Sequence, residues 1–382
     1  MKRKKNDYAA RALVAHKKLR GKIEVRCKAK VASKDDLSIY YTPGVAAVSS
    51  YVAKHKKQMK EYTMKGNTVA IVSDGSAVLG LGNIGPEGAL PVMEGKAMLF
   101  KTFADIDAFP IVLATQDTDE IVATVKHIAP GFGGINLEDI AAPRCFEIER
   151  RLQALLDIPV FHDDQHGTAM VVLAGLINAF KVVKKHPHTS TVVIAGAGAA
   201  GHAIATLLLK FGVSDLIIVD SHGIISKART DLNSFKRWLA KVTNKGDHSG
   251  SVADALIGAD MFIGVSKGGT ITRAMVASMA PRAIVFALAN PIPEIMPDEA
   301  KAAGAAVIAT GRSDFANQIN NSLGFPGIFR GALDHGVREI TDEMLIRGAR
   351  RLAALISRPT RERIIPPPFM KGVVQAVAGA IK

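Results

Sequence analysis

Short apolar runs alternate with helix-length segments along most of the chain from Thr68 onward. Strand-length apolar runs that alternate with helical patterns predict a mostly parallel sheet with crossover helices, which is an α/β fold. The expected strands are Val69–Val72, Pro110–Leu113, Gly134–Leu137, Pro159–Phe161, Thr191–Ala195, Leu216–Val219, Met261–Val265, Ala283–Leu288 and Ala306–Ala309.

The chain of 382 residues is long enough for about two domains of ordinary size. A long apolar helix is expected over Gly167–Phe180, followed by a polar link. We therefore predict an N-terminal α/β domain over residues 1–164 and a doubly wound parallel sheet of the Rossmann type, with C-terminal helices, over residues 165–382. Before the first sheet we expect a helix and an irregular arm up to about Ser33, then a lysine-rich helix over Ser49–Lys60.

A glycine-rich turn follows the expected strand Thr191–Ala195. Its residues are Gly196, Ala197, Gly198, Ala199, Ala200 and Gly201, and an apolar helix and a second strand ending at Asp220 come next. In a dinucleotide-binding unit the glycines allow a tight turn and close approach of the pyrophosphate, the helix N-terminus faces the phosphates, and an acid about 20 residues on bonds a ribose hydroxyl. The order of the parts favours this unit over a glycine-rich turn in another α/β sheet.

Acidic residues follow three expected strands of the first domain. Asp74 follows the first strand, Glu138 and Asp139 follow the third, and Asp163 and Asp164 follow the fourth. Ligands of parallel sheets bind at the carboxyl ends of the strands, and clustered carboxylates suit a hard cation such as Mg²⁺ or Mn²⁺. The alternative is that these acids cap helices. His162 and His166 either join the metal shell or are structural.

Lys96 lies among apolar residues on a helix expected over Met93–Phe100. Burial in apolar surroundings lowers the pKa of a lysine, which is what a general base requires. The alternative is a surface lysine whose stem packs on apolar neighbours while its amine reaches water.

The net charge of +14 is concentrated in residues 1–34, 54–65 and 344–382. Nucleic-acid binding would call for interleaved aromatic residues, but these make up only 5% of the chain, so a solvated or subunit-bridging surface is favoured. No apolar stretch approaches the length of a membrane span. The two cysteines, Cys27 and Cys145, match no metal or redox spacing and favour free thiols and a cytoplasmic location.

Taken together, these motifs resemble the malic enzymes, specifically the short bacterial type. The resemblance runs from about residue 8 to at least residue 350. Its motifs are Tyr41–Ala46, Ser73–Ser76, Leu79–Pro86, Pro91–Ala97, Gly133–Ile140, Phe161–Ala169, Ala289–Pro291, Thr310–Asp314, Asn317–Asn321 and Phe325–Gly327.

The resemblance implies metal-dependent oxidative decarboxylation of (S)-malate to pyruvate and CO₂, with reduction of NAD⁺ or NADP⁺ and with Mg²⁺ or Mn²⁺ as the metal. It implies that Glu138, Asp139 and Asp164 are the metal ligands. It also implies a role for each remaining site residue: Lys96 as general base, Tyr41 as the acid that protonates C3, Asp163 beside the lysine, and Asn290 and Asn321 on substrate or nicotinamide ribose. Together with the basic N-terminal arm, it implies a homodimer.

Two features limit what the resemblance implies. Larger family members bind a malate carboxylate with an arginine, and Ala77 stands at that position here.

The choice between NAD and NADP stays open. Asp220 favours NAD, because it would repel a 2′-phosphate. The residues that follow it could instead bind such a phosphate, namely Ser221, His222, Lys227 and Arg229. Malolactic or oxaloacetate-decarboxylating activity, or a non-catalytic dinucleotide- or polyanion-binding role, are the alternative functions.

Overall fold

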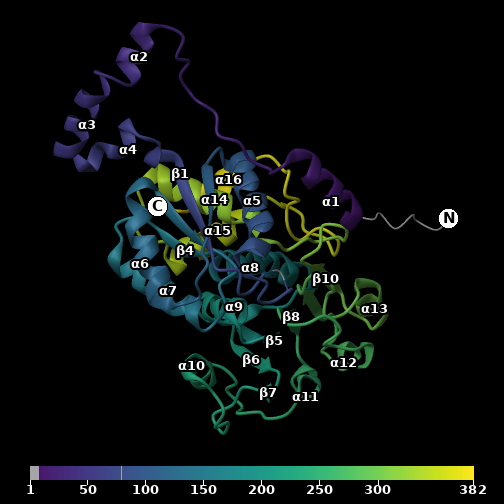
Figure 1. Ribbon diagram of the computed structural model, residues 1–382. Helices are drawn as coiled ribbons and strands as arrows, with labels where there is room; N and C mark the ends of the chain where they lie inside the picture. The colour runs from purple at the N-terminus through teal and green to yellow at the C-terminus, as the bar shows by residue number, and fades with distance from the viewer. Residues whose placement is uncertain (1–7, 79) are drawn as a thin grey trace.

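Two sheets organise the computed structural model, which describes residues 8–78 and 80–382 (Figure 1). Seven of the eight residues of the motif Leu79–Pro86 are therefore described, while Leu79 itself and the start of the basic segment lie outside the described residues. The first sheet has the order β2-β1-β3-β4 and the second the order β10-β9-β8-β5-β6-β7, and only β7 is antiparallel to its neighbour. The predicted parallel α/β fold is thus confirmed. The strands are β1 (Thr68–Ser73), β2 (Asp107–Val112), β3 (Gly134–Leu137), β4 (Val160–His162), β5 (Thr191–Ala195), β6 (Asp215–Asp220), β7 (Gly223–Ile224), β8 (Met261–Gly264), β9 (Ile284–Ala287) and β10 (Val307–Thr310).

The strand β1 is buried on both faces, which explains its uninterrupted apolar sequence. Val69 and Ile71 pack into the core that contains helix α5 (Gly85–Ala104), whereas Ala70 and Val72 pack on the opposite face with α6 (Thr118–Ile128) and α7 (Arg144–Leu155). This division follows from the two-residue period of side chains along a strand.

The carboxyl ends of three strands meet at one edge of the first sheet. In the register of the sheet, Val72 pairs with Leu137, and Leu137 pairs with His162. The acidic residues that follow these three strands therefore leave the sheet side by side.

Helix α8 (Asp163–Val183) begins where β4 ends and runs between the two sheets. It contacts α9 (Ala199–Phe211) and α15 (Asp342–Ala354), and its apolar residues belong to a core that also contains residues of both sheets. By length and composition α8 is apolar enough to cross a membrane, which the sequence analysis did not expect, but 72% of its apolar window is buried inside the protein. Burial of this extent is typical of a central core helix.

The chain returns to the first sheet at its C-terminal end. Helix α14 (Phe325–His335) contacts α5, and the ring of Phe100 lies 4.7 Å from that of Phe325 and 5.4 Å from that of Phe329, measured between centroids. Helix α16 (Val373–Ala378) packs against both α14 and α15. The remaining helices flank the second sheet: α10 (Ser234–Val242), α11 (Val252–Leu256), α12 (Arg273–Ala277) and α13 (Pro297–Ala302).

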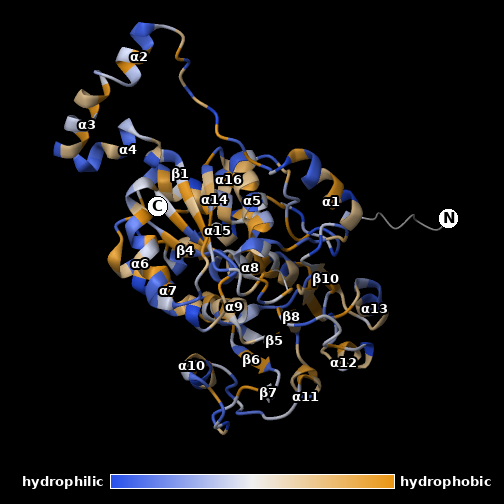
Figure 2. Ribbon diagram, in the orientation of Figure 1, coloured by the Kyte–Doolittle hydropathy of each residue, from blue (hydrophilic) through white to orange (hydrophobic). Residues whose placement is uncertain are grey.

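The N-terminal helices α1 (Tyr8–Leu19), α2 (Lys34–Tyr40) and α3 (Val45–Lys54) contain no buried residue. An extended segment leads from α1 to α2, and α2, α3 and α4 (Met59–Tyr62) project from the body of the protein (Figure 1). Figure 2 shows hydrophobic residues on α3, and Val45, Val48 and Tyr51 of this helix are exposed. We call residues 20–62 the arm.

The predicted single helix over Ser49–Lys60 is wrong. Helix α3 ends at Lys54, His55 adopts non-helical dihedral angles, and a short 3₁₀ turn precedes α4. The lysines at positions 54, 56, 57 and 60 would repel one another along a continuous helix, which favours the break.

Asn178 joins α8 to the C-terminal part of the chain, because its side-chain amide donates to the carbonyl oxygens of Ala353 (2.8 Å) and Ile364 (2.9 Å). We expect Asn178→Ala to lower the free energy of unfolding by about 1–3 kcal/mol, since the carbonyl of Ile364 loses its side-chain donor while that of Ala353 keeps only the backbone N–H of Ile356. Urea denaturation measures the loss. A change below about 0.5 kcal/mol, the range of a neutral surface substitution, would contradict this role.

Candidate functional site

Lys96 lies in the middle of α5 and its side chain is only 5% exposed. Its ammonium Nζ is 2.5 Å from Oε2 of Glu138, bonds Oδ2 of Asp163, and lies 4.3 Å from the centroid of the Phe325 ring. A buried ammonium requires such partners, because desolvation of an unpaired charge is costly. The alternative of a surface lysine is therefore wrong.

The charge state of Lys96 differs from the sequence-based expectation. Burial acts to lower the pKa of Lys96, but the carboxylates of Asp163 and Glu138 outweigh it, and the net direction is upward. In the protein without ligands, Lys96 is therefore a cation. The expectation of a pKa lowered by apolar neighbours overlooked two acids that are distant in sequence.

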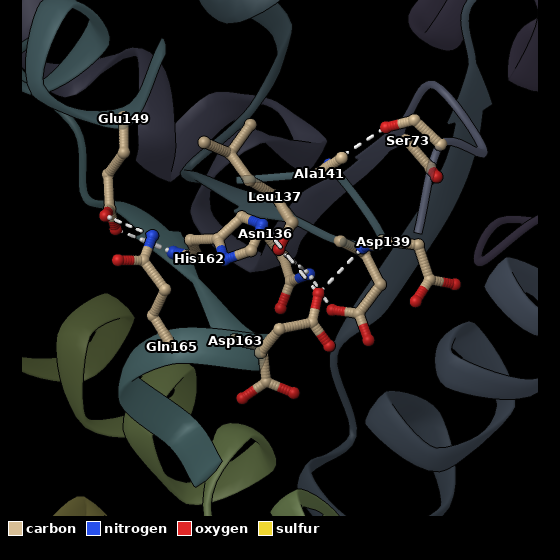
Figure 3. Close-up of polar contacts among 12 residues, drawn as sticks. Ser73, Asn136, Leu137, Asp139, Ala141, Glu149, His162, Asp163 and Gln165 are labelled. Carbon is tan, nitrogen blue, oxygen red and sulfur yellow. Dashed lines mark hydrogen bonds and ion pairs between the residues drawn. The ribbon is translucent and has the colours of Figure 1, made fainter. Parts of the chain in front are cut away.

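Glu138, Asp139 and Asp164 come together at the edge of the first sheet. Each offers a carboxylate oxygen, and these three atoms lie within 4.8 Å of one another. The backbone N–H of Asp139 also donates to Oδ2 of Asp164 at 2.8 Å, and Asn136 donates to Oε2 of Glu138 at 3.0 Å. Figure 3 shows Asp139 of this cluster, with the neighbouring Asp163, near the ends of the strands.

The electrostatics of this cluster suit a divalent cation. Burial raises the pKa of Glu138 and of Asp163 to about 7, and that of Asp164 to about 6, although Lys96 opposes all three shifts. One ammonium does not offset the negative charge of four neighbouring carboxyl groups, and an all-oxygen donor set is the kind that Mg²⁺ and Mn²⁺ prefer. The residues present therefore fit a hard divalent cation.

None of these acids caps a helix with its side chain. The N-cap position of α8 is His162, which forms no side-chain capping bond, and the N-cap position of α7 is Pro143. Neither position is one of the acids. Asp139 has a left-handed backbone with φ of 54° in a loop. Asp74 bonds the backbone and hydroxyl of Ser76, and its other oxygen lies 3.0 Å from the guanidinium of Arg144. The capping alternative is thus wrong for this set.

The two histidines of the site differ in their contacts. His166 bonds Oε2 of Glu149 at 3.0 Å, and Glu149 also accepts bonds from the backbone of His162 (2.8 Å) and the side chain of Gln165 (3.1 Å). His166 is thus held by α7. The ring of His162 is fully buried, and its Nε2 lies 3.7 Å from Oδ2 of Asp164. Burial lowers the pKa of His162 to about 4, so its ring is neutral.

The two asparagines lie on loops that approach the first domain. A Cβ atom on Gly167 would collide with the carboxylate of Asp163 and would stand 3.6 Å from the Cβ of Asn321, so Asn321 lies beside the Lys96–Asp163 pair. Asn290 lies between Gly80 and Gly311. A Cβ atom added to Gly80 would collide with the carbonyl oxygen of Asn290, and one added to Gly311 would collide with its side-chain amide. The second sheet therefore contributes Asn290 to the space between the domains.

Tyr41 does not join the other site residues within one chain. It follows α2 on the projecting arm, and 66% of its surface is exposed (Figure 1). The structure brings together Lys96, Asp163, Asn321 and the three carboxylates, but not Tyr41.

The glycine-rich turn connects β5 to α9, and its three glycines meet different surroundings. Gly196 has φ of +118°, and a Cβ there would stand 2.5 Å from the carbonyl oxygen of Val265. A Cβ on Gly201 would collide with the carbonyl oxygen of Gly196, whereas a Cβ on Gly198 would meet no atom within 4 Å. Gly198 instead faces a cavity of about 850 Å³ lined by Ala197, Asp220 and Lys236, which fits a dinucleotide.

Asp220 at the end of β6 is engaged by cations. Its oxygens lie 2.8 Å from a guanidinium nitrogen of Arg229 and 2.6 Å from Nζ of Lys236, and it accepts the backbone N–H of His222. Burial acts to raise the pKa of Asp220, but bonds from Arg229 and Lys236 outweigh it and hold this pKa at about 2. The acid therefore remains charged, but two cations offset its charge.

Sequence reasoning overlooked Asn136, Arg144, Glu149 and Lys236. A signal was available for Asn136, which interrupts the apolar strand Gly134–Leu137 at a position that a parallel sheet buries. Arg144, Glu149 and Lys236 reach their partners from helices, and nothing in the local pattern distinguishes them from surface residues.

The glycines give a test that separates cofactor contact from protein packing. We expect Gly198→Ala to leave the unfolding midpoint unchanged but to weaken NADPH binding by about tenfold or more, since the added methyl occupies space that a pyrophosphate would approach. Gly201→Ala should instead destabilise the free protein by about 1–3 kcal/mol through overpacking. NADPH fluorescence titration and thermal unfolding measure the two effects. Equal NADPH affinity in Gly198→Ala and the unchanged protein would contradict this geometry.

Comparisons with known proteins agree with the arrangement of two domains. Residues 20–153 match the N-terminal domain of malic enzymes, and residues 165–381 match the NAD-binding domain of malic enzymes. The chain is 54% identical to the bifunctional malic/malolactic enzyme of Bacillus subtilis, over 97% of this chain and 91% of that protein. It is 55% identical to the NAD-dependent malic enzyme of Geobacillus stearothermophilus, over 94% of this chain and 76% of that protein.

Solved structures give the same result. The NAD-dependent malic enzyme of Thermotoga maritima superimposes with a TM-score of 0.94 at 49% identity, covering 97% of this chain and 98% of that one. Entamoeba histolytica malic enzyme also superimposes with a TM-score of 0.94, at 40% identity over 98% of this chain and 80% of that one. These matches cover nearly the whole chain, and this chain therefore belongs to the malic enzyme family.

Proposed function

We propose that this chain oxidatively decarboxylates (S)-malate to pyruvate and CO₂ and reduces NAD(P)⁺. The observation that carries the proposal is the buried Lys96 ammonium between Asp163 and Glu138, directly beside three convergent carboxylates. A hydroxy acid offers this site a hydroxyl proton for Lys96 and oxygen atoms for a divalent cation. The cavity at Gly198 supplies room for the dinucleotide.

We assign the proton transfers to residues of this chain. With a cation bound, Lys96 would release its proton to solvent, and its neutral amine would then take the proton of the C2 hydroxyl. Asp163 holds the amine in place, and Tyr41 donates a proton to C3 after CO₂ leaves. Glu138, Asp139 and Asp164 hold Mg²⁺ or Mn²⁺. When bound, the cation would polarise the C2 oxygen and offset the negative charge that keeps the proton on Lys96, and NAD(P)⁺ would accept the hydride.

Substrate recognition without an arginine at Ala77 falls to amide groups in this proposal. Asn321 lies next to Asp163, and Asn290 lies where the loop of Gly80 meets the second domain. Both side-chain amides donate hydrogen bonds, which suits the carboxylates of malate or the nicotinamide ribose. Residues 1–164 would then carry the metal and the proton transfers, and residues 165–382 the cofactor.

We propose that both NAD and NADP are accepted. The repulsion of a 2′-phosphate by Asp220 is offset by Arg229 and Lys236, which bind its two oxygens. Lys236 stands at the cavity wall beside Asp220, where a phosphate would find positive charge.

We propose a homodimer in which the arm of one chain completes the site of its partner. Tyr41 is exposed at the end of α2, and hydrophobic residues of the arm, including Leu37, Ile39 and Val48, are exposed with it. Exposed apolar patches of this kind mark interfaces. A twofold arrangement would exchange the arms symmetrically and bring the Tyr41 of each chain to the Lys96 of its partner.

The free thiols Cys27 and Cys145 support a cytoplasmic location.

A malolactic outcome is the second candidate function, favoured by the name of the Bacillus subtilis relative. The same site would then reduce the pyruvate it forms to lactate before the nicotinamide leaves. Oxidation and reduction balance within one catalytic cycle, so no reduced cofactor accumulates.

Incubation with (S)-malate, Mn²⁺ and either NAD⁺ or NADP⁺ tests the proposed function. We expect pyruvate and reduced cofactor in equal amounts with both nucleotides, and no reaction after EDTA treatment, because the three carboxylates lose their cation. Absorbance of the reduced cofactor and enzymatic determination of pyruvate give both amounts. Lactate without reduced cofactor would instead identify the malolactic activity, and no product from folded, Mn²⁺-loaded protein would refute both.

Two inactive variants test the exchange of arms. Tyr41→Phe and Lys96→Ala should each be nearly inactive alone, and an equimolar mixture that is unfolded and refolded together should regain about a quarter of the unchanged activity. Half of the dimers formed at random are mixed, and each mixed dimer has one site with both residues intact. Refolding each variant separately before mixing is the control. An unrestored mixture that contains mixed dimers would place both residues in the same chain.

A further inference from the structure

Two polar side chains interrupt the apolar ends of adjacent strands beneath the acidic cluster. Asn136 lies in β3 and His162 ends β4, and both are 0% exposed. The strands are neighbours, with Asn136 paired to Phe161 and Leu137 paired to His162. A parallel sheet that is buried on both faces normally carries apolar residues at such positions, and buried polar groups are costly unless they form hydrogen bonds.

Asn136 already holds one of the proposed metal ligands. Its side-chain nitrogen donates to Oε2 of Glu138 at 3.0 Å, and the same oxygen lies 2.5 Å from Nζ of Lys96. Two donors thus bind one oxygen of this carboxylate. The other oxygen, Oε1, is left for a cation, in a direction that the two donors define.

His162 lies in the corresponding place below Asp164. Oδ2 of Asp164 accepts the backbone N–H of Asp139 at 2.8 Å, and Nε2 of His162 lies 3.7 Å from the same oxygen. Neither ring nitrogen of His162 has a hydrogen-bond partner in the described part of the chain. A distance of 3.7 Å is too long for a hydrogen bond, but a small rotation of Asp164 would close it.

The strand end that carries His162 is itself held in place. Glu149 of α7 is buried and accepts the backbone N–H of His162 and a bond from Gln165 (Figure 3). It also bonds His166 of α8. The ring has no room to turn away, because it is fully buried. Asp164 is the partner of the pair with room to rotate, since its side chain is 33% exposed.

We propose that Asn136 and His162 are positioning residues that orient Glu138 and Asp164 toward the divalent cation, each by donating a hydrogen bond to one carboxylate oxygen. The inference rests on the metal site of the proposed function. It assigns His162 a bond to Asp164 rather than to the cation, because Mg²⁺ and Mn²⁺ prefer oxygen ligands. Outer partners of this kind fix the direction of the lone pairs that the cation meets.

Direct measurement of Mn²⁺ affinity tests the proposal without substrate, cofactor or turnover. Electron paramagnetic resonance reports free Mn²⁺ during titration of the purified full-length protein. We expect His162→Phe and Asn136→Leu to raise the Kd for Mn²⁺ by about 10- to 100-fold, as loss of such partners does elsewhere. His162→Gln, whose amide can still donate toward Asp164, should recover part of the affinity. NADPH affinity should stay unchanged in all variants.

Asn178→Ala is the matched control, because it removes a buried asparagine that bonds carbonyls far from the acids. It should lower stability without a change in the Kd for Mn²⁺. If His162→Phe does not fold, His162→Ala replaces it, since the smaller side chain fits the same space and donates nothing.

The outcomes separate this inference from the function on which it rests. If the unchanged protein does not bind Mn²⁺, the proposed metal site is wrong. If the unchanged protein binds Mn²⁺ and the folded His162 and Asn136 variants bind it equally well, the positioning roles are wrong. Loss of Mn²⁺ and NADPH affinity together would also overturn the proposal, because it would indicate general damage to the fold.

Discussion

The buried contact of the Lys96 ammonium with the carboxylates of Asp163 and Glu138 is the interaction on which the site depends. Removing three charged groups from water is costly, and each is tolerable only because the others lie within bonding distance. The three residues come from α5, the start of α8 and the end of β3. The contact therefore aligns one helix, one sheet edge and the beginning of the helix that joins the two sheets.

The charge balance of this contact explains why the site is suited to a cation. Lys96 offsets only part of the negative charge of the neighbouring acids, and burial raises the pKa values of Glu138, Asp163 and Asp164. Bringing a divalent ion to these oxygens would remove the remaining repulsion. The same ion would weaken the hold of the carboxylates on the lysine proton, so the proposed metal binding and the proposed base function of Lys96 would be coupled through shared groups.

Helix α8 connects this chemistry to the stability of the whole protein. Its first turn carries Asp163 and Asp164, and the rest of the helix lies in a core shared by both sheets. Asn178 then ties its C-terminal half to the last part of the chain. The edge that carries the acids is thus attached to a largely buried helix, which keeps the carboxylates in place.

Local sequence was sufficient for the parallel sheets, the glycine-rich turn and the acids at the strand ends. Apolar runs report burial on both faces, and parallel pairing places the carboxyl ends of strands at one edge, so Glu138, Asp139 and Asp164 were expected to meet. The raised pKa of Lys96, the neutralised charge of Asp220 and the exposed position of Tyr41 depended on tertiary structure. Each depends on groups distant in sequence, and the energy of a charge is determined by what surrounds it in space.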